Sequence, residues 1–472
     1  MDEPFRNWYR HRFPAKPEIP PGYVLKVNGA LQGHPESPRL WQNLIDDIIQ
    51  QLELKPCTHE PNLYYCRNYK GTNKTVLFLR QIDDFAISAE DTDTAKDVIQ
   101  SINNKMKIDV KELGLINRFN GVDVTQTRDF IKLSNATYLK KIFLHHQWLK
   151  DEPPLKTYDP LPMLSNPSYQ RDLELAKPLS CHEREKVEKE YGFSYRSAIG
   201  EIIYALVTCR PDISFPCIKL SQYSARPAQI HFDAIKHLFK YLYATQTDGI
   251  YFWRPRPRHD LPPCPDPISH KDNNYDASLS AGRYQTDPRT LIGSADSDYA
   301  GDNSHRKSVT GLCLKLAGGP VLYKTHFQSS IALSSTEAEF VAACEAGKYI
   351  LYLRTILEQI GIPQTEATTL YEDNQGALLM ANAKRPTKRT RHVDVKYFVI
   401  QQWVENDLLT LEHIATADNY ADAITKSLGR NLQYRHMDFI MGKLRPDYAS
   451  PAQIPLHVHS IICRDLRIIG FK

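Results

Sequence analysis

Acidic residues at the boundaries of apolar segments constrain the last third of the chain more than any other feature. Asp296 follows the run LIGSA, Glu339 lies in SSTEAEFVAA, Asp373 follows LYE and Asp422 lies in DNYADAITK. A site with two divalent cations about 4 Å apart needs carboxylates that converge from separate rigid elements. The pattern therefore predicts a two-metal site of the kind that cuts phosphodiesters.

The segments that flank these acids predict strands and helices able to bring them together. The β-rich runs SVTGLCLKLA and GPVLYKTH, divided by Gly318 and Gly319, indicate a hairpin after the strand that ends at Asp296. Residues 336–360 have the apolar spacing of a long helix. A strand (ATTLYED), a helix (HVDVKYFVIQQWVE), a strand (LLTLEHIA) and a short helix capped by Asn419 follow. The predicted order is βββαβαβα.

This order, together with the surrounding words, resembles the ribonuclease H of copia-type LTR retrotransposon Pol polyproteins. The matching words are SADSDYAGD, SHRKSVTG, ALSSTEAEF, EDNQGALLMA, KRTRHVDVKYF, NYADAITKSLGR and RHMDFIMG. The resemblance implies that Asp296, Glu339, Asp373 and Asp422 bind Mg²⁺ or Mn²⁺. It also implies that the domain cleaves the RNA strand of an RNA:DNA hybrid, with water as the nucleophile.

Other polar residues near these acids leave alternatives open. Glu337 competes with Glu339, but two positions on a helix differ by a rotation of about 200°, so only one faces the site. Glu339 fits the family pattern better. Asp298 and Asp302 are candidate supporting groups, with loop caps as the alternative, and His413 and His392 are candidates for proton transfer, with a surface or capping role as the alternative.

A second acidic pair lies upstream, inside TVLFLRQIDDFAISAE. Burying Asp83 and Asp84 without a metal or a partner would cost free energy. The pair resembles the aspartates at the hairpin tip of a reverse transcriptase palm, and the resemblance implies that both are catalytic and that Asp83 binds metal. GALQGHPESPRLW, ELGLINRFNGVDV and residues 197–245 resemble the nucleotide pocket, the primer grip and the thumb-to-connection region of the same family. The resemblance covers nearly the whole chain.

The sequence also departs from this family. The third palm carboxylate opens a D-x-x-x-A-F word, and no such word precedes GALQGHPESPRLW, so we expect an incomplete palm. Gln81 replaces the aromatic residue before the paired acids, and His34, Pro35 and Glu36 replace an apolar residue, a lysine and a glutamine. These changes are expected to weaken contacts with primer and nucleotide. Phe398 stands where the family commonly has a second histidine.

Composition and charge are consistent with several folded domains that act on nucleic acid. The 472 residues are 42% hydrophobic, which supports about three domains. The net charge is only +4, but a basic cluster, KRPTKRTRH, is expected to contact phosphates, with a solvated loop as the alternative. Its candidate nucleic-acid-binding residues are Lys384, Arg385, Lys388, Arg389 and Arg391.

Targeting patterns, cysteines and prolines bear on location and on domain organisation. No segment has the pattern of a signal peptide or a membrane span, and the cysteines form no C-x-x-C pair, which favours a reducing compartment. We therefore expect a cytoplasmic location, within a virus-like particle, or a nuclear one. Six prolines between Pro255 and Pro267 predict a mobile linker.

The predicted fold class is α/β (α+β), with a palm followed by a helical region and a five-stranded mixed sheet. The predicted domains are an incomplete palm with primer grip (1–145), thumb and connection (146–253), a linker (254–290), a ribonuclease H-like domain (291–430) and a C-terminal tail (431–472).

The expected function is hydrolysis of RNA in RNA:DNA hybrids by the C-terminal part of a copia-type Pol protein. Two alternatives remain, an RNA-directed DNA polymerase if upstream residues are supplied, and an inactive remnant that only binds nucleic acid. The expected partners are an RNA:DNA hybrid and a template-primer, without a membrane, and the oligomeric state is open.

Overall fold

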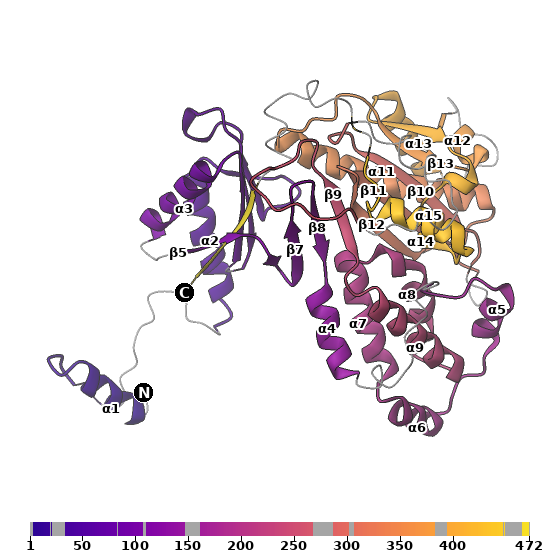
Figure 1. The fold of residues 1–472 in the computed structure, drawn as a ribbon, viewed down its shortest axis with the longest axis horizontal. Helices are drawn as coiled ribbons and strands as arrows, with labels where there is room; N and C mark the ends of the chain where they lie inside the picture. Colours follow the sequence, from indigo (N-terminus) through magenta and orange to yellow (C-terminus); the bar gives the residue numbers. More distant parts are fainter. Residues whose placement is uncertain are drawn as a thin grey trace.

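The computed structural model describes most of the chain, and its described residues form three sheets with their helices (Figure 1). The described residues are 3–18, 20, 34–82, 84–106, 110–146, 161–267, 287–301, 306–382, 394–446, 448 and 465–471. Within them, no helix is both long and apolar enough to cross a membrane. The mixture of helices and sheets confirms the predicted fold class.

The N-terminal part contains a six-stranded sheet of order β1-β2-β3-β4-β15-β5, drawn in purple with one yellow strand in Figure 1. Its strands are β1 (Lys55–Pro56), β2 (Leu63–Cys66), β3 (Val76–Gln81), β4 (Asp84–Ala89), β5 (Val110–Leu115) and β15 (Asp465–Phe471). Helices α2 (Ser37–Gln50) and α3 (Thr92–Met106) pack on the sheet through apolar side chains such as Ile49 and Val98. Helix α1 (Glu3–Arg12) buries none of its residues. Residues 465–471, which the sequence placed in a tail, pair with both β4 and β5.

A four-stranded sheet and a helical region follow. The strands are β6 (Arg118–Phe119), β7 (Val122–Gln126), β8 (Phe130–Ser134) and β9 (Gly249–Trp253), in sequential order. The chain between β8 and β9 forms α4 (Ala136–His145), α5 (Pro167–Leu175), α6 (Cys181–Tyr191), α7 (Tyr195–Cys209), α8 (Ser214–Ser221) and α9 (Gln229–Ala244). These helices share one apolar core, which includes Leu139, Ile202 and Phe239.

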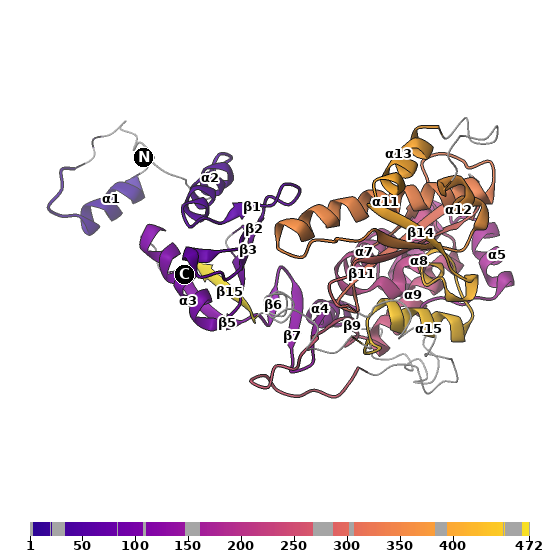
Figure 2. The ribbon, with the colours of Figure 1, turned by 90° about the horizontal axis from the view of Figure 1, so that it is seen from above.

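The C-terminal part contains a five-stranded sheet of order β12-β11-β10-β13-β14 (Figure 2). Its strands are β10 (Ile292–Asp298), β11 (Val309–Leu316), β12 (Gly319–Phe327), β13 (Thr368–Glu372) and β14 (Leu409–His413). Its helices are α11 (Ser335–Gln359), α12 (Gln375–Asn382), α13 (Asp394–Glu405), α14 (Asp422–Thr425) and α15 (Arg430–Ile440). Strands β10, β11 and β12 are antiparallel neighbours, whereas β13 and β14 continue the sheet in parallel to β10.

Both faces of this sheet are covered. Helix α11 lies on one face, where Phe340 and Ile350 pack against Leu312 and Leu370. Helices α14 and α15 cover the opposite face. The hairpin between β11 and β12 turns at Ala317 and Gly318, which both have positive φ angles, one residue earlier than the predicted glycine pair.

Two segments differ from what the sequence predicted. The first part of the proline-rich segment is packed, because Arg254 N donates to Asp129 O, Arg258 N donates to Arg128 O and Pro262 O accepts from Arg128 N. The expected mobility therefore does not describe residues 254–262. The segment after 430 begins as helix α15, which belongs to the core of the sheet and is not a tail. The other domain boundaries stay a prediction.

Candidate metal centre

Three of the predicted acidic residues converge at one end of the five-stranded sheet. Asp296 lies near the end of β10, Asp373 directly follows the neighbouring parallel strand β13, and Glu339 lies near the start of α11. Carboxylate oxygens of Asp296, Glu339 and Asp373 all lie within 4.8 Å of one another. Parallel neighbours end at the same edge of a sheet, which explains why residues 77 positions apart in the sequence meet here.

Asp422, the fourth predicted acid, joins this group from the opposite face of the sheet. It begins helix α14, and burial, followed by repulsion from the nearby Asp296, raises the pKa of its carboxyl group. Thr425 on the same short helix donates its hydroxyl hydrogen to Asp296 Oδ2. The four predicted carboxylates therefore form one cluster, whose members come from two strand ends and two helices.

The choice between Glu337 and Glu339 follows from helix geometry. Ser334 accepts a hydrogen bond from Glu337 N, and Glu337 Oε2 accepts from Leu333 N, so Glu337 serves the exposed N-terminus of α11. Glu339 is buried instead, with 7% of its surface exposed. Glu339 is thus the residue that reaches the cluster.

Lys426 is a central residue of this site that the sequence reasoning did not identify. Its Nζ lies 3.5 Å from Asp296 Oδ1 and 3.0 Å from Asp422 Oδ1. Burial lowers the pKa of Lys426, but the adjacent Asp296 and Asp422 carboxylates outweigh burial and raise this pKa overall. The ammonium group thus supplies a positive charge between two of the acids. The available signal was the spacing, since Lys426 lies four positions after Asp422 in the sequence.

Glu372 is a second residue that the sequence reasoning missed. It ends β13, is fully buried, and its Oε1 accepts a hydrogen bond from Asn374 N. Burial and the nearby Asp373 and Asp296 raise its pKa well above the usual value. The adjacent acids of LYED could have indicated it, since alternation along a strand points one of two neighbours inward.

Burial and mutual repulsion raise the pKa of several carboxyl groups in the acidic cluster. Burial, followed by repulsion from Asp296, Glu372 and Asp373, raises the pKa of Glu339. Burial is also the largest cause of the raised pKa of Asp422 and of Asp373. Glu339 Oε2 and Glu372 Oε2 are buried without a hydrogen-bond partner. Unpartnered buried carboxylate oxygens are the ligands that hard divalent cations prefer, so the residues present fit such ions.

Asn419 has a different role from the predicted helix cap. The residue that precedes α14 is Ala421, whereas Asn419 is fully buried and connects strand β10 to the segment before the helix. Its Oδ1 accepts hydrogen bonds from Ser294 Oγ and Ala421 N, and its Nδ2 donates to Ala295 O. Asn419 therefore fixes the position of the helix that carries Asp422.

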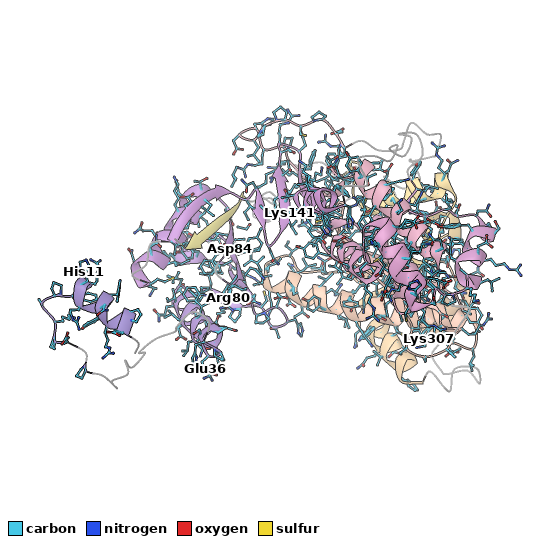
Figure 3. The ribbon with its side chains drawn as sticks, turned by 90° about the horizontal axis from the view of Figure 1, so that it is seen from below. His11, Glu36, Arg80, Asp84, Lys141 and Lys307 are labelled. Carbon is cyan, nitrogen blue, oxygen red and sulfur yellow. The ribbon has the colours of Figure 1, made fainter. Side chains whose placement is uncertain are left out.

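The remaining predicted site residues lie elsewhere. Asp84 is exposed at the start of β4, in the N-terminal sheet and away from the five-stranded sheet (Figure 3). Asp83 falls outside the described residues, although Gln81 pairs with Asp84 and thereby confirms the hairpin. The basic cluster Lys384, Arg385, Lys388, Arg389 and Arg391 also lies outside the described residues.

Of the remaining candidates, Asp298 and His413 are described, whereas Asp302 and His392 lie outside the described residues. Burial raises the pKa of Asp298 to about 6. This residue lines a cavity of about 230 Å³ together with Lys426 and with Lys219 of helix α8. The helical region therefore borders the acidic cluster. His413 is exposed at the end of β14.

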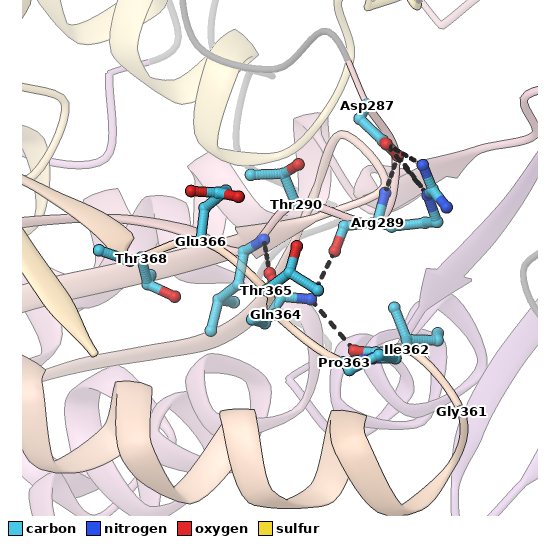
Figure 4. Close-up of a pocket in the computed structure, with 12 residues that line it drawn as sticks. Asp287, Arg289, Thr290, Gly361, Ile362, Pro363, Gln364, Thr365, Glu366 and Thr368 are labelled. Atoms are coloured by element: carbon cyan, nitrogen blue, oxygen red, sulfur yellow. Dashed lines mark hydrogen bonds and ion pairs between the residues drawn. The ribbon is translucent and has the colours of Figure 1, made fainter. Parts of the chain in front are cut away.

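A further cavity, of about 250 Å³, lies near the opposite end of β10 (Figure 4). Its wall includes Gln364, whose side chain accepts from Leu291 N and donates to Arg289 O. Asp287 and Arg289 form an ion pair at its rim. Since Leu291 precedes β10 and Asp296 lies near its other end, this cavity is separate from the acidic cluster.

Comparisons with known proteins give relatives for most of the chain. The family model described as "Reverse transcriptase (RNA-dependent DNA polymerase)" matches residues 13–155. The retrovirus-related Pol polyprotein from transposon TNT 1-94 of Nicotiana tabacum is 29% identical over 415 residues, covering 86% of this chain and 27% of that polyprotein. The Pol polyprotein from transposon RE1 of Arabidopsis thaliana is 24% identical over 410 residues, covering 87% of this chain and 24% of that polyprotein.

This chain thus spans about a quarter of the length of each of these two polyproteins. Among solved structures, LC11-RNase H1 in complex with an RNA/DNA hybrid matches with a TM-score of 0.23 and 13% identity, over 29% of this chain and 93% of that one.

Proposed function

We propose that residues 291–430 hydrolyse the RNA strand of RNA:DNA hybrids, in a chain that is similar over most of its length to retrovirus-related Pol polyproteins of transposons. The observation that carries this proposal is the convergence of Asp296, Glu339 and Asp373 within 4.8 Å, with Asp422 next to Asp296 because both contact Lys426 Nζ. The strand order of the five-stranded sheet and the words quoted above favour the copia-type branch of the family.

The proposed ligands of Mg²⁺ or Mn²⁺ are Asp296, Glu339, Asp373 and Asp422. Two such cations, when bound, activate the attacking water and stabilise the charge that develops on the phosphate. The chain positions the ligands for this purpose. Thr425 holds one oxygen of Asp296 by its hydroxyl group, and Lys426 draws Asp296 and Asp422 together.

Substrate binding is proposed to rest on the basic cluster from Lys384 to Arg391, which follows helix α12 in the sequence. Phosphate contacts of this kind release counterions, so affinity for the hybrid should fall steeply with added salt. Neutralising two of these basic residues should flatten the slope of log affinity against log salt by about two units.

The experiment that tests the proposal compares Asp373→Asn with the parent chain on a hybrid with labelled RNA. Asp373→Asn should abolish Mg²⁺-dependent cleavage but leave hybrid binding largely in place, because it removes a ligand charge and no basic residue. Asp407→Asn is the matched control. Asp407 is exposed in a turn of the same domain and has a positive φ angle, which asparagine tolerates.

Cleavage by Asp373→Asn at the parental rate would exclude Asp373 as a metal ligand. If the parent chain binds the hybrid and cleaves nothing in Mg²⁺ or Mn²⁺, the chain is an inactive element that only binds nucleic acid. Single-stranded RNA and duplex DNA serve as substrates that should remain uncut.

A second candidate function is RNA-directed DNA synthesis. The family model that matches residues 13–155 favours it, together with the β3–β4 hairpin, whose second strand begins at Asp84 directly after the turn. The sequence lacks the word that carries the third palm carboxylate, so this activity requires that carboxylate from another source. Extension of a primer on an RNA template distinguishes this activity from hybrid cleavage.

A further inference from the structure

Two histidines and a glutamate converge in the helical region, outside the acidic cluster. His145 ends α4, His146 follows it directly, and Glu201 lies in the first half of the neighbouring helix α7 (Figure 1). One ligand atom from each of His145, His146 and Glu201 lies within 4.8 Å of the other two. No residue of this group takes part in the function proposed above.

The two oxygens of Glu201 point to different histidines. Glu201 Oε2 lies 2.7 Å from His146 Nε2, and Glu201 Oε1 lies 3.9 Å from His145 Nδ1. A tetrahedral zinc ion with bonds of about 2.0–2.2 Å separates its ligand atoms by about 3.4 Å. The two histidine–glutamate separations each differ from that spacing by less than 1 Å, and the third pair of ligand atoms lies within 4.8 Å, so side-chain rotations can bring the three atoms to zinc distances.

The group is rigid on one side and open on the other. The His146 ring is buried and packs against the rings of Phe239 and Phe193, with centroid distances of 4.6 and 5.7 Å. His145 has 70% of its side chain exposed, so an ion can enter from solvent. The C-terminal end of α4 adds partial negative charge next to both histidines.

An ion pair alone explains only half of this arrangement. The His146–Glu201 hydrogen bond gives a partner to one oxygen of Glu201, the one acidic residue in the apolar run SAIGEIIYALVTC. It does not require His145 to face the second carboxylate oxygen. A shared cation accounts for both contacts, because it uses all three side chains at once.

We propose that His145, His146 and Glu201 form a binding site for Zn²⁺ or a similar transition-metal cation that joins α4 to α7. Two imidazoles and one carboxylate favour zinc, cobalt or nickel, whereas the acidic cluster, which offers only oxygen ligands, suits magnesium or manganese. The three protein ligands leave a fourth position for water. The site is independent of the proposed nuclease function.

The test measures Zn²⁺ binding to the full chain by calorimetry, with excess Mg²⁺ present to occupy oxygen-only sites. His145→Ala and Glu201→Gln should each weaken zinc binding at least about tenfold, since loss of even an indirect contact to a metal costs that much. His182→Ala is the matched control, because His182 is exposed on α6 of the same helical region and should leave affinity unchanged.

Absorption of bound Co²⁺ gives a second readout, since a tetrahedral site with two imidazoles should produce visible bands that His145→Ala removes. Zinc should also raise the melting temperature of the parent chain and of His182→Ala, but not that of His145→Ala. Equal zinc affinity in the parent, His145→Ala and Glu201→Gln would overturn the proposal, as would no zinc binding by the parent at micromolar concentration.

Discussion

At the scale of single residues, the acidic cluster brings buried carboxylates close together, and the positive charge of Lys426 offsets part of their repulsion. Buried carboxylates that repel one another destabilise a fold unless positive charge lies between them. Lys426 contacts Asp296 and Asp422, which are two of the proposed metal ligands. We infer that its ammonium group holds these carboxylates together when no cation is bound, and that it competes with the cation for them.

The first prediction concerns Lys426→Met. Without the ammonium group the metal-free chain should melt at a lower temperature, because repulsion between Asp296 and Asp422 is no longer offset. Affinity for Mn²⁺ should rise by about tenfold, which corresponds to about 1.4 kcal/mol of binding free energy, because the ammonium group no longer competes for the two carboxylates. Calorimetry and thermal unfolding measure both effects. Lys348→Met on the exposed side of α11 is the control. Unchanged melting and affinity in Lys426→Met would contradict the inference.

The second prediction concerns Lys315, which is buried in β11 away from the acidic cluster. Burial lowers its pKa to about 7, and Nζ donates a hydrogen bond to Phe439 O. The unfolded chain keeps this proton up to the usual lysine pKa, so the folded state is penalised at neutral pH and less so as pH rises toward about 10.5.

The free energy of unfolding of the parent chain should therefore gain a contribution from Lys315 that rises between about pH 7 and pH 10. This contribution should be absent in Lys315→Met. The slope of unfolding free energy against pH should differ between parent and variant by at most about 1.4 kcal/mol per pH unit, the value for one proton bound by the unfolded state and not by the folded state. Urea unfolding of the parent and variant across this range measures the difference. Parallel pH profiles would show that Lys315 does not titrate there.

At the scale of secondary-structure elements, a helix of four residues places Asp422. Helix α14 lies against β11 at Gly311, which pairs with Asp296 across the sheet. A Cβ atom at Gly311 would lie 2.3 Å from Thr425 Cγ2 and 3.0 Å from Ile424 Cγ1. The missing side chain at this position thus allows α14 to approach the strand closely enough for Asp422 to reach Asp296.

The third prediction is that Gly311→Ala displaces α14. Hybrid cleavage and Mn²⁺ affinity should both fall, although no carboxylate is changed, and overpacking should cost about 1–3 kcal/mol of stability. Gly429→Ala is the control, because nothing lies within 4 Å of a Cβ atom there. If Gly311→Ala destabilises the chain but leaves the Mn²⁺ affinity at the parental value, metal binding does not depend on the position of α14.

At the scale of the whole molecule, the N-terminal and C-terminal sheets carry separate acidic residues. Helix α11 connects them, because Glu339 lies near its start and Gln359 at its end contacts the N-terminal part. Gln359 exchanges hydrogen bonds with Thr58, and its carbonyl oxygen accepts from Arg67. The long helix α11 thus reaches from the acidic cluster to the N-terminal part at Thr58 and Arg67.

The fourth prediction follows from this separation. Asp83→Asn should change hybrid cleavage little, because its hairpin belongs to the N-terminal sheet, away from the carboxylates of β10 and β13. Cleavage rates of the parent and of Asp83→Asn, with circular dichroism as a check of folding, measure this. A large loss of cleavage in a folded variant would mean that both halves share one centre.

The sequence by itself determined the kinds of elements and the positions of the predicted acids along them. Hydrophobic periodicity and turn residues act over a few positions, which is why helix α11 and the β11–β12 hairpin were predicted within about one residue. Four acids at element boundaries were recognisable for the same reason. The resemblance to a known family then indicated how the elements pair.

Only the tertiary structure decided which other groups surround these acids. Lys426, Glu372 and Asn419 acquire their roles through contacts between segments far apart in the sequence, such as the bond between Ser294 and Asn419. The same holds for the packing of residues 254–262 and for helix α15, which the sequence placed in a linker and a tail. A local pattern carries no information on such contacts, because burial and charge depend on which distant segment covers a residue.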